Sequence, residues 1–410
     1  MQQILKNEFG GMSDVLYNLA SATGDDRWAR TADRFHKKEF LQPLALHRDE
    51  LRTLHANTHI PQVIGAARRY ELSDDYRFHN AAAFFWHAVV AGRTYSTGGS
   101  SNNERWLTEP GRLATEMRAS SNHQECCCAY NMMKLTRQLY SWTGDPRYID
   151  YYERNLLNHR LGAIQPDTGR SIYFLSLTPG TWKTLCAEDN SFWCCTGSAL
   201  EEYAKLADTV YYHDAQGIYV NLFTASELNA EQMGLRLRQV TKFPEESRTA
   251  LHIDAAPAKA VALRLRIPAW LDGAPAVRLN GRRLDASGAP GSYLTLTRVW
   301  KKGDRIELDL PFSIRVEGTP DDAGLQSFLY GPLVLAADLG TQGLTDELVV
   351  NHQGPAVSKS PVAAPVLKAA DKLKPGQAPL SFAIESSTGP LRLSPIYQHW
   401  KRFAIYFQVA

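Results

Sequence analysis

Apolar side chains follow a helical period in the first half of the chain and a period of two in the second half. One helix face near the start is formed by residues three or four apart, namely Phe9, Met12, Val15, Leu16 and Leu19. The pattern stops at Thr23-Gly24-Asp25 and resumes at Asp26, which predicts two helices joined by a tight turn. Residues 1–210 are therefore predicted to be mainly helical.

This unit of helix, turn and helix is repeated. A second copy has its turn at Thr143-Gly144-Asp145-Pro146, and a weaker copy has its turn at Ser73-Asp74-Asp75. Glycine just past a helix end and Asp-Pro at a helix start are favoured turn chemistry. Repeated hairpins that each bury one face predict a helical toroid or barrel, with an irregular helical domain as the alternative.

Beyond residue 210 the alternation predicts short antiparallel strands, for example at 261–267, 293–296 and 306–310. Turn sequences such as Leu279-Asn280-Gly281-Arg282 separate them. We expect a β-sandwich over 211–340. The remaining part, 341–410, contains a segment at 354–379 rich in Ala, Pro and Lys and an alternating tail, and is expected to add a surface loop and terminal strands.

Composition narrows the possible functions. The 410 residues are enough for two or three domains, and the net charge of +2 comes with no basic run that would favour nucleic acid. The sequence contains no apolar stretch of ~18 residues, so we expect no membrane partner. The N-terminus lacks the apolar core of a signal peptide, which favours the cytoplasm for the chain as it stands. A truncated N-terminus would leave the periplasm or secretion open as alternatives, so the sequence does not fix the compartment.

Five of the six cysteines lie in two short runs, Glu125-Cys126-Cys127-Cys128 and Cys194-Cys195. A carboxylate beside several thiolates is a ligand set that suits zinc, although the spacing is not that of a zinc finger. The alternative is that these cysteines are buried small side chains or disulfide partners. Adjacent cysteines such as Cys194 and Cys195 rarely bridge each other without strain.

Two further segments carry candidate chemistry. The polar loop 97–106 contains two glycines and ends near Glu104, with Glu109 and Glu116 as rivals. Glu104 is either a solvated loop charge or an acid that works with a metal-activated thiolate on the other side of a sugar carbon. The segment 55–61 places His55, Asn57 and His59 close together, for binding sugar hydroxyls or for a capping or core role.

At these residues the sequence resembles the zinc-dependent β-L-arabinofuranosidases, a family of glycoside hydrolases. The matching segments lie along most of the chain and comprise Glu8-Phe9-Gly10-Gly11-Met12, His55-Ala56-Asn57-Thr58-His59-Ile60-Pro61, Thr97-Gly98-Gly99 with Glu104, Glu125-Cys126-Cys127, Tyr130-Asn131-Met132, Tyr151-Tyr152-Glu153-Arg154, Phe192-Trp193-Cys194-Cys195 and Tyr330-Gly331-Pro332-Leu333-Val334.

The resemblance implies an (α/α)6-type barrel in residues 1–210, followed by β-sandwich domains. It implies a Zn²⁺ ion held by Glu125, Cys127, Cys194 and Cys195. Cys194 would be the nucleophile and Glu104 the acid/base of a retaining hydrolase that removes terminal β-L-arabinofuranosyl residues from plant glycans or glycoproteins. His55, Asn57 and His59 would lie on the substrate side.

One departure from the family pattern concerns the start of the chain. Family members carry a long helical segment before the Glu-Phe-Gly-Gly motif, whereas this chain begins almost at it. We therefore expect a barrel that lacks its N-terminal helices and exposes apolar helix faces. The alternatives to the hydrolase are a zinc-stabilised, non-catalytic carbohydrate-binding protein and a sugar-active barrel enzyme of other linkage specificity.

Overall fold

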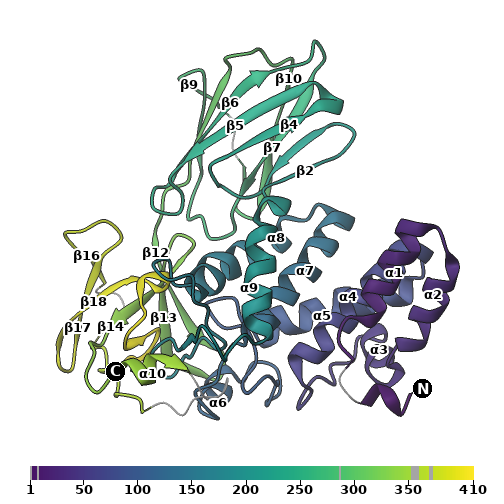
Figure 1. Cartoon of the computed structure of the whole chain (residues 1–410). Helices are drawn as coiled ribbons and strands as arrows, with labels where there is room; N and C mark the ends of the chain where they lie inside the picture. Colours follow the sequence, from purple (N-terminus) through teal and green to yellow (C-terminus); the bar gives the residue numbers. More distant parts are fainter. Residues whose placement is uncertain (1, 7–8, 286–287, 352–359, 369–372) are drawn as a thin grey trace.

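A helical part and two β parts follow one another along the chain (Figure 1). The computed structural model describes residues 2–6, 9–285, 288–351, 360–368 and 373–410. Glu8 and part of the expected loop at 354–379 lie outside the described residues. The order of the parts confirms the predicted fold class, a helical domain followed by β-sheet domains. Among the described helices, none is both long enough and apolar enough to cross a bilayer.

The helix hairpins form where the turn sequences predict them. The α-helices are α1 (Met12–Thr23), α2 (Asp26–Ala32), α3 (Lys38–Ala45), α4 (Ala56–Ser73), α5 (Tyr76–Gly92), α6 (Leu113–Met117), α7 (Cys126–Thr143), α8 (Pro146–Asn155), α9 (Cys194–Ala204) and α10 (Asp346–Val349). Gly24 and Gly144 end α1 and α7 with φ of 69° and 65°, and Asp74 takes the same left-handed role after α4. An aspartate then accepts a backbone N–H at the start of each next helix.

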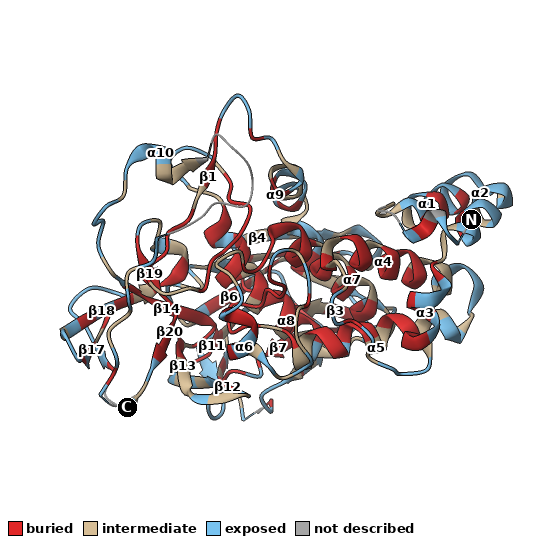
Figure 2. Ribbon diagram, turned by 90° about the horizontal axis from the view of Figure 1, so that it is seen from below, coloured by how far each residue is buried: buried red, intermediate tan, exposed pale blue. Residues whose placement is uncertain are grey.

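Four helices form a row in which α1 packs on α4, α4 on α7, and α7 on α9. The middle helices α4 and α7 are largely buried, whereas much of α1 and α2 is exposed (Figure 2). The helices at the two ends of the row expose apolar side chains, namely Met12, Val15 and Leu19 on α1 and Leu200 and Tyr203 on α9. The expected exposure of apolar helix faces is therefore present.

The first β part is a sandwich of two sheets. Its strands are β2 (Tyr211–His213), β3 (Gly217–Val220), β4 (Ser226–Ala230), β5 (Leu235–Thr241), β6 (Arg248–Ala255), β7 (Val261–Ile267), β8 (Ala276–Leu279), β9 (Arg282–Arg283), β10 (Ser292–Arg298) and β11 (Arg305–Asp309). One sheet has the order β10-β7-β3-β2 and the other β4-β5-β6-β11-β8-β9. Their inward-facing residues share one apolar core, as the alternation predicts.

The second β part is a separate sheet with the order β12-β13-β14-β18-β17-β16, on which β19 and β20 also pair. Its strands are β12 (Ile314–Thr319), β13 (Asp322–Tyr330), β14 (Leu333–Asp338), β16 (Lys374–Pro375), β17 (Phe382–Ser386), β18 (Gly389–Pro395), β19 (Phe403–Ala404) and β20 (Tyr406–Gln408). A short parallel pair joins β1 (Leu185–Cys186) to β15 (Val350–Asn351). Because residues 314–338 pair with the C-terminal strands, we propose a domain boundary near residue 313 in place of the expected 340.

A buried charge network joins the helical part to the sandwich. Arg266 on β7 is fully buried, and its guanidinium binds Asp150 at 2.6 Å and Glu153, both on α8. Its Nε also donates to the carbonyl oxygen of Asn221 at 2.7 Å. Trp270 completes the network by donating its indole N–H to Glu153 at 2.8 Å. Each charge in the network is therefore compensated by a partner from the other part of the chain.

Replacing Arg266 by alanine should destabilise the protein by about 3–5 kcal/mol, because it leaves the buried Glu153 and the half-buried Asp150 without their cation. The control is Arg248→Ala, which removes an exposed pair with Asp309 and should cost less than about 1 kcal/mol. Chemical denaturation of both variants measures the difference. Equal effects would show that the buried network does not hold the two parts together.

Candidate active site

The N-termini of α7 and α9 meet at one point of the structure. Glu125 is the residue before α7 and Cys127 is the second residue of that helix, whereas Cys194 and Cys195 are the first two residues of α9. The partial positive charge of a helix N-terminus favours thiolates and carboxylates placed there. The two cysteine runs are thus brought together by the packing of α7 on α9.

These four side chains can hold a metal ion. One ligand atom from each residue lies within 4.8 Å of all the others. The sulfurs of Cys127 and Cys195 are 3.4 Å apart, and Glu125 Oε1 lies 3.9 and 3.8 Å from the sulfurs of Cys194 and Cys195. A tetrahedral site with ordinary zinc bond lengths needs roughly 3.8 Å between sulfurs and about 3.6 Å between sulfur and oxygen. The donor set and its spacing therefore fit a zinc-sized cation.

The electrostatics of the cluster also favour a cation. Burial raises the pKa of the Glu125 carboxyl well above its usual value, and the neighbouring Glu104 raises it further. Hydrogen bonds from Cys127 and then Cys195 lower the pKa of the exposed Cys194 thiol. A buried carboxyl beside an anionic sulfur is costly without a positive partner, which a metal ion would supply.

The loop that carries Glu104 depends on two glycines. Gly98 has a φ of 94°, and a Cβ there would lie 2.6 Å from the Cα of Asn155. A Cβ on Gly99 would lie 2.4 Å from the side-chain oxygen of Gln124. Only glycine fits this close approach, so the Gly-Gly pair lets the loop pack directly on the helical part.

Glu104 itself is held at the tip of a tight turn. The backbone groups of Asn102 and Arg105 bond each other in both directions, at 2.8 and 3.0 Å. The two central residues, Asn103 and Glu104, have φ values of 45° and 64°, the signs of a type I′ turn in which glycine is usual at the second position. A glutamate in this conformation is strained, and such strain is concentrated at functional sites.

The Glu104 carboxylate receives two hydrogen bonds. His55 Nδ1 accepts the backbone N–H of Thr58, so its Nε2 carries the proton and donates to Glu104 Oε2 at 3.1 Å. Tyr173 donates its hydroxyl to Glu104 Oε1 at 2.5 Å. The bond from His55 is the main cause that lowers the pKa of Glu104, and Tyr173 adds to it. His55 thus combines the expected capping role on α4 with contact to the candidate acid.

Tyr173 is a candidate site residue that the sequence did not reveal. Its hydroxyl contacts Glu104 and also lies 3.6 Å from the sulfur of Cys194. Burial is the main cause that raises its pKa, so it remains a protonated donor. Tyr173 lies in an irregular segment between α8 and α9 and belongs to no motif, so no sequence signal marked it.

Asn57 and His59, the other two residues expected to contact the substrate, lie in different surroundings. Asn57 donates its side-chain N–H to Glu125 Oε1 at 2.9 Å, and its own oxygen accepts from Asn131 at 3.1 Å. His59 is buried against Phe40 and bonds Lys37 Nζ at 3.1 Å. Burial lowers the pKa of His59 to about 4. Asn57 therefore joins the metal cluster, whereas His59 lies in the core behind it.

The rival glutamates and the remaining cysteines have other partners. Glu109 is exposed and pairs with Arg52 at 3.3 Å, and Glu116 is buried and accepts the backbone N–H of Leu107 at 2.8 Å. Cys128 donates to Glu125 Oε2 at 3.2 Å. Cys126 faces His159 at 3.6 Å, and Cys186 lies 3.7 Å from the hydroxyl of Ser171.

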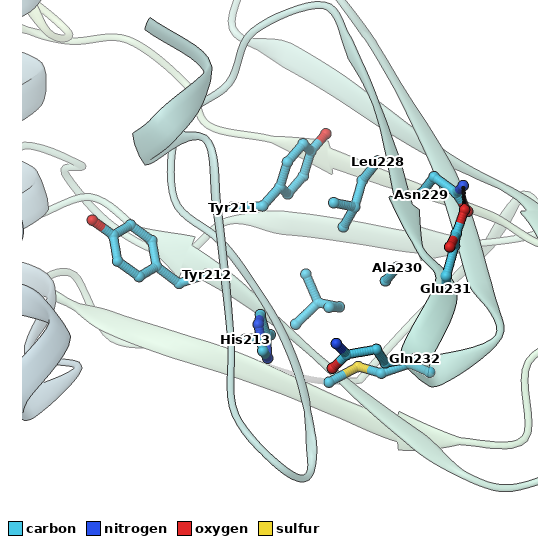
Figure 3. A pocket seen from close by; sticks show the side chains of 10 residues that line it. Tyr211, Tyr212, His213, Leu228, Asn229, Ala230, Glu231 and Gln232 are labelled. Atoms are coloured by element: carbon cyan, nitrogen blue, oxygen red, sulfur yellow. Dashed lines mark hydrogen bonds between the residues drawn. The ribbon is translucent and has the colours of Figure 1, made fainter. Parts of the chain in front are cut away.

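A cavity of about 340 Å³ opens elsewhere, in the sandwich, between the β2–β3 hairpin and the segment that follows β4 (Figure 3). Leu228 and Ala230 contribute to its wall, and Asn229 donates to Glu231 at 3.0 Å. Tyr212 points away from it toward the helical part, where its ring packs on Tyr140 (Figure 3). None of the candidate site residues lines this cavity.

Two protein-family models match the sequence and identify its family. The model described as the GH127 catalytic domain of β-L-arabinofuranosidase matches residues 1–208, and the GH127 middle-domain model matches residues 217–312. The chain belongs to the GH127 β-L-arabinofuranosidase family. This confirms the resemblance drawn from the motifs and makes the chain a member of a glycoside hydrolase family, with carbohydrate as its class of substrate.

Solved structures agree with the GH127 fold. A glycoside hydrolase shares 20% identity and a TM-score of 0.77 with this chain, over 97% of it and 74% of the other chain. A GH127 β-arabinofuranosidase shares 19% identity and a TM-score of 0.79, over 97% of this chain and 68% of the other chain. A GH127 β-L-arabinofuranosidase from Geobacillus stearothermophilus T6 shares 17% identity and a TM-score of 0.76, over 97% of this chain and 72% of the other chain. At these identities the likeness shows the fold. No match was found among curated proteins.

Gly98→Ala should disturb the Glu104 loop, because alanine adds both positive-φ strain and a clash with Asn155. The matched control is Gly169→Ala, which has a φ of 70° but no atom within 4 Å of the added Cβ. We expect Gly98→Ala to cost about 1–3 kcal/mol more than the control, the usual penalty of overpacking. Thermal unfolding measures this difference. Equal costs would mean that the loop does not need the close approach.

Proposed function

We propose that this chain is a retaining β-L-arabinofuranosidase that removes terminal β-L-arabinofuranosyl residues from plant glycans or glycoproteins. In this proposal Cys194 is the nucleophile and Glu104 the general acid/base. The observation that carries it is the Tyr173 hydroxyl, which contacts a Glu104 oxygen at 2.5 Å and the Cys194 sulfur at 3.6 Å. Membership in the GH127 family supports the same reaction class.

The separation of the two groups supports a double displacement. Two atoms that share one hydroxyl at these distances lie within about 6 Å of each other, close to the roughly 5–5.5 Å between the catalytic groups of retaining enzymes. An inverting enzyme needs about 6.5–9.5 Å, to leave room for a water molecule. Cys194 is exposed and Glu104 is half-buried, so both can reach a sugar that enters from solvent.

We further propose that the metal is Zn²⁺, held by Glu125, Cys127, Cys194 and Cys195. When bound, zinc keeps its cysteine ligands deprotonated at neutral pH and offsets the negative charge of the cluster. The support for this assignment is the chemistry and spacing of the four donors. Asn57 and Cys128 hydrogen-bond the two oxygens of Glu125 and so fix the orientation of that carboxylate.

In the first half of the reaction, the Cys194 sulfur attacks the anomeric carbon of the arabinofuranosyl group. A carbon–sulfur bond forms as the glycosidic carbon–oxygen bond breaks, and Glu104 gives its proton to the departing oxygen. Cys194 reacts as a thiolate, and Glu104 carries the proton that it takes from water at the end of the preceding turnover. Tyr173 donates its hydroxyl to Glu104 and so orients the carboxyl group.

In the second half, Glu104 acts as a base. Its carboxylate takes a proton from a water molecule, whose oxygen bonds to the anomeric carbon while the carbon–sulfur bond breaks and the Cys194 thiolate is restored. His55 and Tyr173 donate to Glu104 and stabilise its carboxylate form. Two displacements on opposite faces of the sugar retain the anomeric configuration.

Glu104→Gln should lower turnover of β-L-arabinofuranosides by about 10²–10⁴-fold, the usual effect of losing an acid/base. Cys194→Ser should reduce it to background. Glu104→Gln should keep the full zinc content, because Glu104 is not a ligand. Hydrolysis of p-nitrophenyl β-L-arabinofuranoside and elemental analysis measure these outcomes. A non-catalytic carbohydrate-binding protein would show no turnover before or after the changes, and turnover in Cys194→Ser would remove Cys194 as the nucleophile.

Asn57→Ala should weaken zinc binding by about 10–100-fold, because Glu125 loses the hydrogen bond that orients its metal-facing oxygen. Competition with a zinc chelator measures the affinity directly. Asn18→Ala, on the exposed face of α1, is the control and should leave the affinity unchanged. A rise in KM with unchanged zinc affinity would instead support the expected direct contact of Asn57 with substrate.

A further inference from the structure

We infer that Asp321, in the turn between β12 and β13, is a positioning residue for Glu104, so that the C-terminal sheet takes part in acid/base catalysis. The inference rests on the proposed role of Glu104. It joins two features that are distant in sequence. One is the strained turn that presents Glu104, and the other is the short helix α6, which lies between that turn and the C-terminal sheet.

Asp321 holds the start of α6. Its Oδ1 accepts the backbone N–H of Ala114 at 2.8 Å, and its Oδ2 accepts the backbone N–H and the hydroxyl of Thr115 at 3.0 and 2.8 Å. An aspartate that accepts the first free N–H groups of a helix fixes where the helix begins. In this case the cap comes from more than two hundred residues away, so it also fixes α6 to the C-terminal sheet.

The helix α6 in turn holds the turn that contains Glu104. Within α6, Glu116 accepts the side-chain N–H of Asn102 with its backbone oxygen at 2.7 Å. Its carboxylate accepts the backbone N–H of Leu107 at 2.8 Å. Asn102 is the first residue of the turn that presents Glu104, and Leu107 follows shortly after that turn. Both flanks of Glu104 are therefore attached to one buried glutamate.

The turn needs this support because its conformation is costly. Ser101, Asn103 and Glu104 all have positive φ, between 45° and 82°. Side chains rarely adopt this conformation without surrounding contacts that enforce it. The C-terminal sheet also holds the other end of the segment, since the Tyr406 hydroxyl accepts the backbone N–H of Ser96 at 2.9 Å.

The metal cluster is connected to α6 less directly, through His123, whose Nε2 contacts the carbonyl oxygen of Met117 at 2.9 Å. Its ligands belong to the starts of α7 and α9, and neither Asp321 nor α6 contributes a ligand. Loss of Asp321 should therefore move the acid while leaving the nucleophile and the metal in place. A change in acid catalysis with unchanged zinc content would therefore distinguish this role from general destabilisation.

The test compares two arabinofuranosides that differ in their need for an acid. A p-nitrophenyl group leaves with little protonation, whereas a methoxy group needs a proton from Glu104. We expect Asp321→Ala to lower kcat/KM for methyl β-L-arabinofuranoside by about 10–100-fold, and for the p-nitrophenyl substrate by less than about threefold. Asp321→Asn keeps one acceptor oxygen and should fall between Asp321→Ala and the wild type. Zinc content should not change.

Asp322→Ala is the matched control. Asp322 is the next residue and carries the same charge, but it pairs with the exposed Arg118 at 2.7 Å. It should leave the ratio of the two kcat/KM values unchanged. Glu104→Gln is the positive control and should show the same preference for the activated substrate as Asp321→Ala.

Hydrogen exchange of the amides in residues 101–107 provides a readout that is independent of activity. Exchange there should be faster in Asp321→Ala than in the wild type and in Asp322→Ala. If the wild type turns over neither substrate, the proposed function fails, and the exchange result alone then decides the inference. Equal losses on both substrates, or unchanged exchange in residues 101–107, would overturn it.

Discussion

The helices α7 and α9 begin at the same point of the structure, and their first residues place three thiols and a carboxyl group within 4.8 Å of one another. These groups can all be ionised at such short range in a buried place only beside a cation, and without one burial raises the pKa values of Glu125 and Cys195. This constraint explains why Asn57 and Cys128 bond both oxygens of Glu125. Hydrogen bonds from Cys127 and then Cys195 lower the pKa of Cys194, the thiol of the cluster that is exposed.

The rest of the fold places a second carboxyl group, that of Glu104, near that thiol. The glycine-containing loop passes close to α8 so that Glu104 faces Tyr173, and Tyr173 in turn faces Cys194. The C-terminal sheet packs behind both groups, since its strands share one apolar core with Cys126, Cys127 and Cys195. The site is thus built where the helical part and the C-terminal sheet meet. The sandwich is attached to the helical part separately, through Arg266.

The sequence predicts the features that depend on neighbouring residues. The helix hairpins follow from Gly24, Gly144 and the aspartate caps, and the strands follow from alternation. The cysteine runs and the Gly-Gly loop stand out because their residues are adjacent. Tyr173 and Asp321 could not be found in this way, because each acts through contacts with residues far from its own segment. The strand pairing places residues 314–338 with the C-terminal strands and not with the sandwich, which the boundary expected at 340 did not foresee. Alternation along the sequence predicts strands but does not reveal which strands pair.

In the proposed reaction Cys194 carries the sugar during turnover. In Glu104→Gln the activated p-nitrophenyl group still leaves, but no base remains to activate water, so a covalent intermediate should accumulate. Digestion and mass spectrometry of this variant after mixing with p-nitrophenyl β-L-arabinofuranoside should find a pentosyl group on the peptide that contains Cys194. A pentosyl group on another residue, or continued turnover with every peptide unmodified, would contradict this account.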